Sequence, residues 1–274
     1  MPDRKKIVLG NVQKTLFLPL WGRAYETQRL KPRLIDKIAV EILGRVDVDF
    51  STMAKNLSPI TQRGWISRSL LVDKTVRAFL QEHPGGTIIN IGCGLDTTFE
   101  RVDNGKLHWY DLDLPDVIAL RKEFIGECDR RKFIASSFLD DAWLQLLRNE
   151  SHILFIAAGV FYYFEGDQIK DFFRRLADLF PGSELVFDAS SPQGVRIANK
   201  LVIKNSGLDE NSFLKWGIKN TRELSSWDRR IKILKELSYF KGMRSDLPFK
   251  QIVGTFVSDL LKIQWLVHLK FDRE

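Results

Sequence analysis

Cysteine is scarce in this chain, which contains only Cys93 and Cys128 among its 274 residues. Two cysteines cannot build the disulfide framework of a small secreted domain, so we expect a reducing, cytoplasmic setting. Basic residues precede Ile7, but polar residues from Asn11 onward interrupt the apolar region that a secretory signal needs. The sequence therefore predicts no signal peptide.

Long apolar runs, linkers and repeats are also missing. The longest charge-free apolar stretch, residues 151–164, is too short to cross a bilayer, so we expect no membrane partner. With 9 prolines, 18 glycines and a hydrophobic fraction of 44%, the chain is neither disordered nor fibrous. We expect one continuous domain, as a monomer or homodimer.

Motifs for metal and nucleophilic chemistry are absent. The sequence has no CxxC, no HExxH and no His–carboxylate cluster, so we expect no metal, and it has no GxSxG of a serine hydrolase. Its four histidines are interpreted as structural or surface residues, namely His83, His108, His152 and His268. No catalytic residue is identified from the sequence.

Charge is only moderately unbalanced, with 42 Lys+Arg against 35 Asp+Glu and a formal net charge of +7. The basic residues are dispersed in pairs such as Arg130-Arg131 and Arg174-Arg175, each among acidic neighbours. This pattern is typical of solvated helix faces, so we expect no nucleic-acid partner.

The central part of the chain alternates between strand-like and helix-like segments. Apolar runs predict strands over 87–91, 107–112, 132–135, 153–157 and 184–188, and helical spacing predicts helices over 116–124, 141–147 and 166–180. Strands that alternate with helices form a mainly parallel sheet with helices on both faces. The predicted class is therefore α/β.

The two ends of the chain are organised differently. Helical spacing over 28–46 and 66–80 places at least two helices before the first strand. The tail predicts a helix over 221–228, a strand or helix over 231–239 and a strand over 263–271, consistent with a final hairpin. We divide the single domain into an N-terminal helical extension (1–83), a core (84–189), a substrate lid (190–220) and a C-terminal part of the sheet (221–274).

A glycine turn follows the first predicted strand and reads Gly92-Cys93-Gly94. Such a turn lets the backbone approach a ligand at the carboxyl ends of the strands. The third glycine of a dinucleotide fingerprint would fall at Thr97, which weakens a pyrophosphate-binding interpretation. The second strand ends at Asp111 and Asp113, either of which offers a carboxylate to ribose hydroxyls, so the pattern predicts a nucleoside site.

Several segments together resemble the leucine carboxyl methyltransferase family, in particular its bacterial branch of O-methyltransferases similar to the tetracenomycin polyketide carboxyl methylase. The resemblance covers nearly the whole chain. Its segments are Thr15-Leu16 through Pro19-Leu20, Arg23-Ala24, Arg68, residues 90–97 with Arg101, residues 109–115 with Arg121, and residues 213–217 with Trp216.

This resemblance implies a Rossmann-like class I fold that binds S-adenosylmethionine (SAM), with a seven-stranded sheet whose final strand is antiparallel. It also implies a set of cofactor contacts. Arg68 would pair with the methionine carboxylate, Gly92 and Gly94 would approach the cofactor, Asp113 would take the ribose hydroxyls, Ser137-Phe138 would line the adenine, and Arg23 would lie nearby. SAM offers a carboxylate, a diol and a flat base for these groups.

The methyl acceptor implied by the resemblance is the carboxylate of a small molecule, polyketide-like or another secondary metabolite. A carboxylate is already ionised at neutral pH, so in-line displacement needs alignment rather than a general base. We expect Tyr162, Tyr163 and Trp216 to contact the acceptor. Basic residues of the lid, Arg196, Lys200 and Lys204, are candidates to hold its carboxylate.

Two positions depart from the family pattern. Ala158 stands where the family usually has a glutamate, and Ser137 stands where aspartate is common. The first change removes a potential ligand of the cofactor, and the second lowers the strength of a hydrogen-bond acceptor in the site. They motivate an alternative function, a SAM- or nucleoside-binding protein with lost or altered catalysis. An NAD-dependent oxidoreductase is a more distant alternative because of Thr97.

Overall fold

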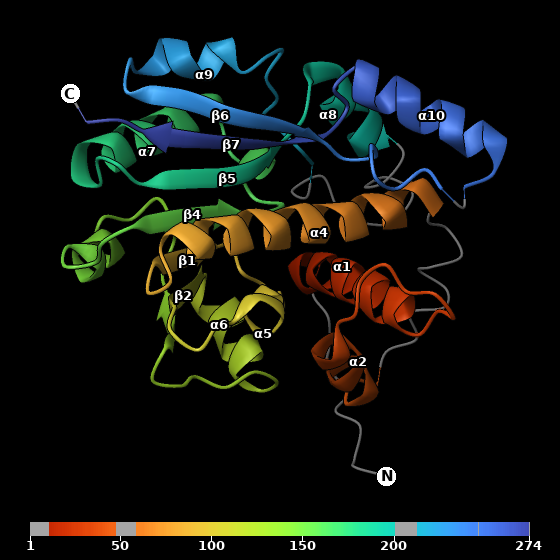
Figure 1. Cartoon of the computed structure of the whole chain (residues 1–274), viewed down its shortest axis with the longest axis horizontal. Helices are drawn as coiled ribbons and strands as arrows, with labels where there is room; N and C mark the ends of the chain where they lie inside the picture. Colours follow the sequence, from red (N-terminus) through yellow and green to blue (C-terminus); the bar gives the residue numbers. More distant parts are fainter. Residues whose placement is uncertain (1–10, 48–58, 201–212, 246, 274) are drawn as a thin grey trace.

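The computed structural model describes residues 11–47, 59–200, 213–245 and 247–273 (Figure 1). Seven strands form one sheet in the order β3-β2-β1-β4-β5-β7-β6. Strands β1 to β5 pair in parallel, and β7 pairs antiparallel with both β5 and β6. The predicted α/β class with an antiparallel final strand is confirmed. The strands are β1 (Thr87–Ile91), β2 (His108–Asp113), β3 (Arg131–Ala135), β4 (Ile153–Ala157), β5 (Glu184–Ala189), β6 (Ile231–Ser238) and β7 (Trp265–Phe271).

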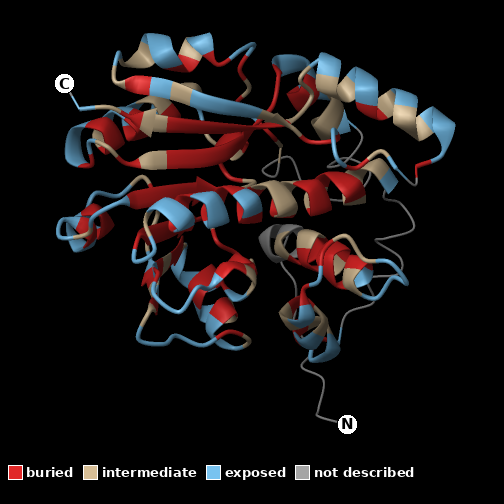
Figure 2. Cartoon of the chain, in the orientation of Figure 1, coloured by how far each residue is buried: buried red, intermediate tan, exposed pale blue. Residues whose placement is uncertain are grey.

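Helices cover both faces of the sheet because its central strands are apolar on both sides. Ile88 and Leu154 face one layer, while the adjacent Ile89 and Phe155 face the other. The first layer contains α4 (Pro59–Glu82) and α5 (Thr98–Val102), and the second contains η1 (Ala142–Leu147), α7 (Gly166–Leu179) and α9 (Arg222–Trp227). Figure 2 shows the central strands of the sheet buried between these layers.

The N-terminal helix α1 (Asn11–Thr27) lies beside α4, and α2 (Lys37–Gly44) packs against α1 (Figure 1). They pack through Phe17 and Ile42 against Leu95 of the glycine turn and the end of α6 (Pro115–Lys122). The predicted helix over 28–46 is wrong in its first part, because α2 begins only after its N-cap Asp36. Residues 28–36, which include Pro32, form turns and bends instead.

The predicted C-terminal hairpin is also wrong in its connection. β6 and β7 are antiparallel neighbours, but α10 (Phe249–Leu260) lies between them in the chain. Within the predicted lid, α8 (Pro192–Ala198) is described, residues 201–212 lie outside the described residues, and the lid itself stays a prediction. Among the described residues no helix combines the length and apolarity that crossing a membrane requires.

Candidate cofactor and acceptor site

A cavity of about 880 Å³ opens at the carboxyl ends of β1, β2 and β4, where ligands bind in open α/β sheets. Its wall brings together α1, α4, the glycine turn, the short helix η2 (Phe161–Tyr163), α8 and α10. All the residues predicted to hold the cofactor lie in this wall, namely Arg23, Arg68, Gly92, Gly94, Asp113, Ser137 and Phe138.

The glycine turn requires both of its glycines. Gly92 has φ +62°, and a Cβ there would lie 2.5 Å from Cγ2 of Val160. Gly94 has φ +47°, and a Cβ there would lie 2.9 Å from Cδ2 of Leu16 in α1. Left-handed backbone and close packing both exclude a side chain, so the bare backbone faces the cavity.

Only one of the two candidate aspartates at the end of β2 lines the cavity. Asp113 accepts hydrogen bonds from the backbone N–H of Gly94 at 2.7 Å and of Leu114 at 2.8 Å. Burial raises the pKa of its carboxyl. Asp111 is fully buried and accepts from Nη2 of Arg121 at 2.7 Å, so it serves the fold.

Arg121 braces the glycine turn from behind. Its Nη1 donates to the carbonyl oxygens of Gly94 at 2.9 Å and Asp96 at 2.8 Å, and its guanidinium pairs with Asp111. Arg121 is only 1% exposed, so the pair fixes the turn without reaching the cavity. Sequence reasoning noted Arg121 as part of a motif but gave it no role.

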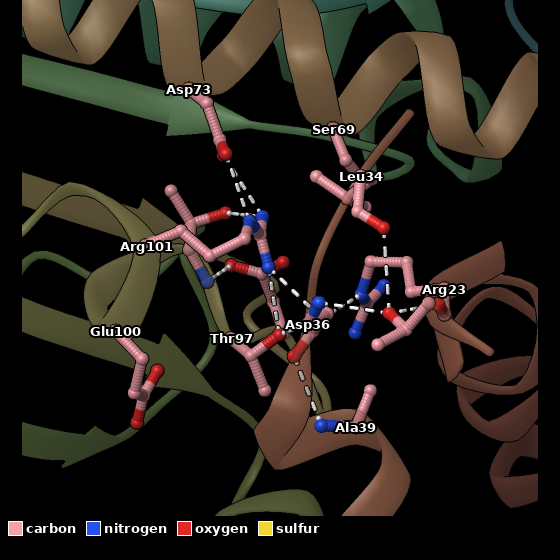
Figure 3. A network of polar contacts seen from close by, with 12 residues as sticks. Arg23, Leu34, Asp36, Ala39, Ser69, Asp73, Thr97, Glu100 and Arg101 are labelled. Carbon is pink, nitrogen blue, oxygen red and sulfur yellow. Dashed lines mark hydrogen bonds and ion pairs between the residues drawn. The ribbon is translucent and has the colours of Figure 1, made fainter. Parts of the chain in front are cut away.

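A buried network holds α1 and α2 against the turn (Figure 3). Arg23 donates through Nε to Asp36 at 2.8 Å and through Nη2 to the carbonyl of Leu95 at 3.0 Å. Arg101 donates to both carboxylate oxygens of Asp73, at 2.8 and 2.9 Å, and to Asp36 at 3.0 Å. Arg23 thus lines the cavity, but these contacts commit its guanidinium to positioning α1.

Sequence reasoning missed both carboxylates of this network. For Asp36 a signal existed, because an aspartate directly before an apolar helical run is a typical N-cap. Its Oδ1 accepts from the backbone N–H of Ala39 at 2.9 Å. Asp73 offered no such signal, since it lies in the middle of α4, away from any helix end or motif.

Another buried carboxylate, that of Asp188 in β5, lies behind Arg68. Its Oδ2 accepts from Nη1 of Arg68 at 3.1 Å and from the hydroxyls of Tyr162 at 3.2 Å and Tyr239 at 3.1 Å. Its Oδ1 accepts from the backbone N–H of Gly159 at 2.6 Å. Burial raises the pKa of Tyr162 well above its ordinary value, and Asp188 adds to the rise. Sequence reasoning did not select Asp188.

The expected acceptor residues separate into two groups. Tyr162 and Tyr163 line the cavity, where burial also raises the pKa of Tyr163. Trp216 does not line it, because its ring packs at 6.3 Å from that of Phe187 and 6.0 Å from that of Trp227 in the core. Trp216 is therefore a packing residue, and its expected contact with the acceptor is withdrawn.

The candidate cations of the lid do not line the described wall. Arg196 is exposed and donates to the carbonyl of Pro192 in its own helix, Lys200 is exposed, and Lys204 lies outside the described residues. The two departures from the family pattern do lie in the wall. Ala158 adds no charge there, and Oγ of Ser137 accepts from the backbone N–H of Leu139 at 3.2 Å.

Comparison with solved structures supports the fold. A Thermobifida fusca YX protein assigned as a methyltransferase superposes with a TM-score of 0.59, at 15% identity, covering 92% of this chain and 94% of that one. A DUF574 family protein from Streptomyces avermitilis superposes with a TM-score of 0.57, at 12% identity, covering 91% and 96%. At these identities the likeness shows the fold alone.

Comparison of sequences gives the family. The chain is 32% identical over 225 residues to the tetracenomycin polyketide synthesis O-methyltransferase TcmP of Streptomyces glaucescens, covering 80% of each protein. It is 28% identical over 206 residues to the S-adenosyl-L-methionine-dependent methyltransferase dpfgK of Gibberella zeae, covering 68% of this chain and 69% of that protein. The leucine carboxyl methyltransferase family model matches residues 17–177. As its motifs predicted, the chain belongs to the leucine carboxyl methyltransferase family and is a SAM-dependent O-methyltransferase.

Proposed function

We propose that this enzyme methylates the carboxylate of a small, largely apolar molecule. The observation that carries the proposal is the chemistry of the acceptor side of the cavity, which is apolar and poor in acids and bases. The cofactor side of the same cavity has the groups that SAM requires.

The cofactor residues fit SAM in three respects. Arg68 uses Nη1 for Asp188 and Tyr162, and in the described part of the chain no hydrogen bond occupies its Nε or Nη2. These two donors suit a carboxylate. Asp113 keeps acceptor capacity for a ribose diol, and Phe138 offers an apolar wall to the adenine. When bound, SAM supplies a methyl group on a sulfonium.

The described wall of the cavity contains no evident general base for a neutral acceptor. Among the described wall residues there is no histidine, and Tyr162 and Tyr163 have pKa values raised by burial. The carboxylates of Asp96 and Asp113 accept hydrogen bonds from backbone N–H groups of the site. A phenol or alcohol would need a base, whereas a carboxylate is ionised at neutral pH. The wall therefore favours a carboxylate acceptor.

The remaining wall favours an apolar acceptor that is held loosely at its reacting end. Ile60, Trp65, Val257 and Leu261 contribute apolar surface from α4 and from the α10 region. The two arginines of the described wall already pair with Asp36 and Asp188. Neutral donors such as the Tyr163 hydroxyl would orient the acceptor oxygen without capturing it. By likeness to TcmP, which is named for polyketide synthesis, a polyketide-like acid is the first class to test.

The test is transfer of labelled methyl groups from SAM to matched pairs of apolar aromatic acids and the corresponding alcohols or phenols. We expect transfer to acids, and the product should release methanol in mild base as esters do. The rate should be nearly constant with pH above the acceptor's own pKa. Transfer to phenols alone would contradict the carboxylate proposal. S-adenosylhomocysteine (SAH) binding without transfer to any acceptor class would favour the alternative of lost catalysis, and Asp113→Ala is the negative control.

A further inference from the structure

We infer that Asp188 is a positioning residue, which sets how Arg68 presents its guanidinium to the carboxylate of the cofactor. The inference rests on the proposed role of Arg68 in holding SAM. Asp188 belongs to β5 and is fully buried, and it does not line the cavity. Any effect of Asp188 on a ligand must therefore pass through the groups it holds.

Asp188 connects its own strand, β5, to three other segments of the chain. Its two oxygens accept from Arg68 of α4, from Gly159 and Tyr162 after β4, and from Tyr239 after β6. Four donors satisfy the acceptor sites of a carboxylate in full. The charge of Arg68, whose side chain is 15% exposed, is thereby compensated inside the protein.

The geometry divides the guanidinium into two parts. Nη1 is taken by Asp188 at 3.1 Å and by the Tyr162 hydroxyl at 3.3 Å. Gly159 permits this arrangement, because a Cβ at that position would lie 2.7 Å from Nη1. Restraint of Nη1 leaves the Nε and Nη2 edge to present to a ligand, the edge that binds a carboxylate with two parallel hydrogen bonds.

Removal of Asp188 has two opposing effects on a ligand carboxylate. Loss of the negative charge of Asp188 would strengthen the attraction of the ligand carboxylate to Arg68. Loss of the only ion-pair partner found for Arg68 in the described residues leaves a largely buried cation uncompensated, and such a charge is costly enough that a long side chain relocates. Ligand binding must then bring the Arg68 side chain back to its position. We therefore expect the second effect to exceed the first, so that the affinity for a ligand with a carboxylate falls.

Calorimetric titration with two ligands distinguishes positioning from general damage. SAH carries the amino acid carboxylate, while 5′-methylthioadenosine shares the adenosine and sulfur but lacks that carboxylate. We expect Asp188→Asn to weaken SAH binding roughly ten- to one-hundred-fold, the range for hydrogen bonds to charged groups. The affinity for 5′-methylthioadenosine should change less than about threefold, a smaller change than the tenfold that corresponds to 1.4 kcal/mol.

A matched control is Asp111→Asn, which breaks a second pair between an arginine and a fully buried aspartate at the same sheet edge. Its partner Arg121 braces the glycine turn, so both ligands should weaken by a similar factor. A double-mutant cycle adds a second readout. In an Arg68→Ala background, Asp188→Asn should no longer change the SAH affinity. If Asp188→Asn does not fold, Asp188→Glu, which keeps the charge but displaces it, should show the same selective loss.

The outcomes separate the two proposals. Equal losses for both ligands, an unchanged SAH affinity or a gain in SAH affinity would each overturn the positioning role while leaving the proposed function intact. A gain would mean that Asp188 merely competes with the cofactor for Arg68. Failure of the unaltered protein to bind SAH would overturn the proposed cofactor contacts as well.

Discussion

Substitution of Asp36 by alanine tests whether the buried network holds α1 and α2 to the sheet (Figure 3). The Asp36 carboxylate is 2% exposed and accepts from Arg23, Arg101 and Thr97 through one oxygen. Its other oxygen caps α2 through the N–H of Ala39. Arg101 retains Asp73, but Arg23 keeps only the carbonyl of Leu95 among the contacts described above.

The expected cost of Asp36→Ala follows from these contacts. Breaking a buried ion pair by removing one partner costs about 3–5 kcal/mol, and loss of an N-cap alone costs about 1 kcal/mol. Because Arg101 keeps its second carboxylate, we expect a total loss of about 3–5 kcal/mol rather than the sum of both terms. Direct contact of α1 with the glycine turn predicts weaker SAH binding in addition.

Urea unfolding followed by circular dichroism and tryptophan fluorescence measures this loss, with agreement of the two signals as a check on cooperativity. Asp129→Ala, at an exposed turn, is the matched control and should change stability by less than about 0.5 kcal/mol. A loss below about 1 kcal/mol for Asp36→Ala would show that the network adds no more than an ordinary N-cap. The reasoning from buried pairs would then be refuted.

Three further predictions concern the site. Asp113→Ala should weaken SAH and 5′-methylthioadenosine by similar factors of about tenfold or more in calorimetry, because the ribose is common to both; loss for SAH alone would contradict a ribose contact. Gly92→Ala should lower the urea midpoint by the equivalent of about 1–3 kcal/mol. Gly105 has φ +78°, but an added Cβ there would meet no atom within 4 Å, so Gly105→Ala should cost less because it introduces backbone strain alone. Asp96 should contribute to acid resistance. Burial raises the pKa of its carboxyl, but the neighbouring Arg101 and Arg23 lower it by more, so that the pKa falls from 3.8 to about 2. The stabilisation by the ionised Asp96 is therefore complete above pH 4 and lost as the pH falls through 2. The free energy of unfolding of Asp96→Asn should accordingly depend less on pH between these values.

Local patterns were enough to predict the central elements of the fold. β1 and β4 have the predicted bounds, β3 and β5 differ from them by one residue at one end, and β2 is shifted by one residue at both ends. β1 and β4 are buried at every position, and the glycine turn and the Asp113 position follow directly from where β1 and β2 end. Periodicity did not predict α1, with Pro19 inside it, or α10, whose exposed residues include Phe249 and Leu260.

The sequence by itself determined the α/β class, the family and the residues that meet in the cavity, because short-range patterns and motifs encode them. Only the tertiary structure decided which side chains face a ligand. It separated Asp113, in the wall, from the fully buried Asp111, and it placed Trp216 in the core. It also revealed Asp188, whose four donors come from three distant parts of the chain. Such contacts arise when crossovers bring strand ends together, so no local pattern in the sequence announces them.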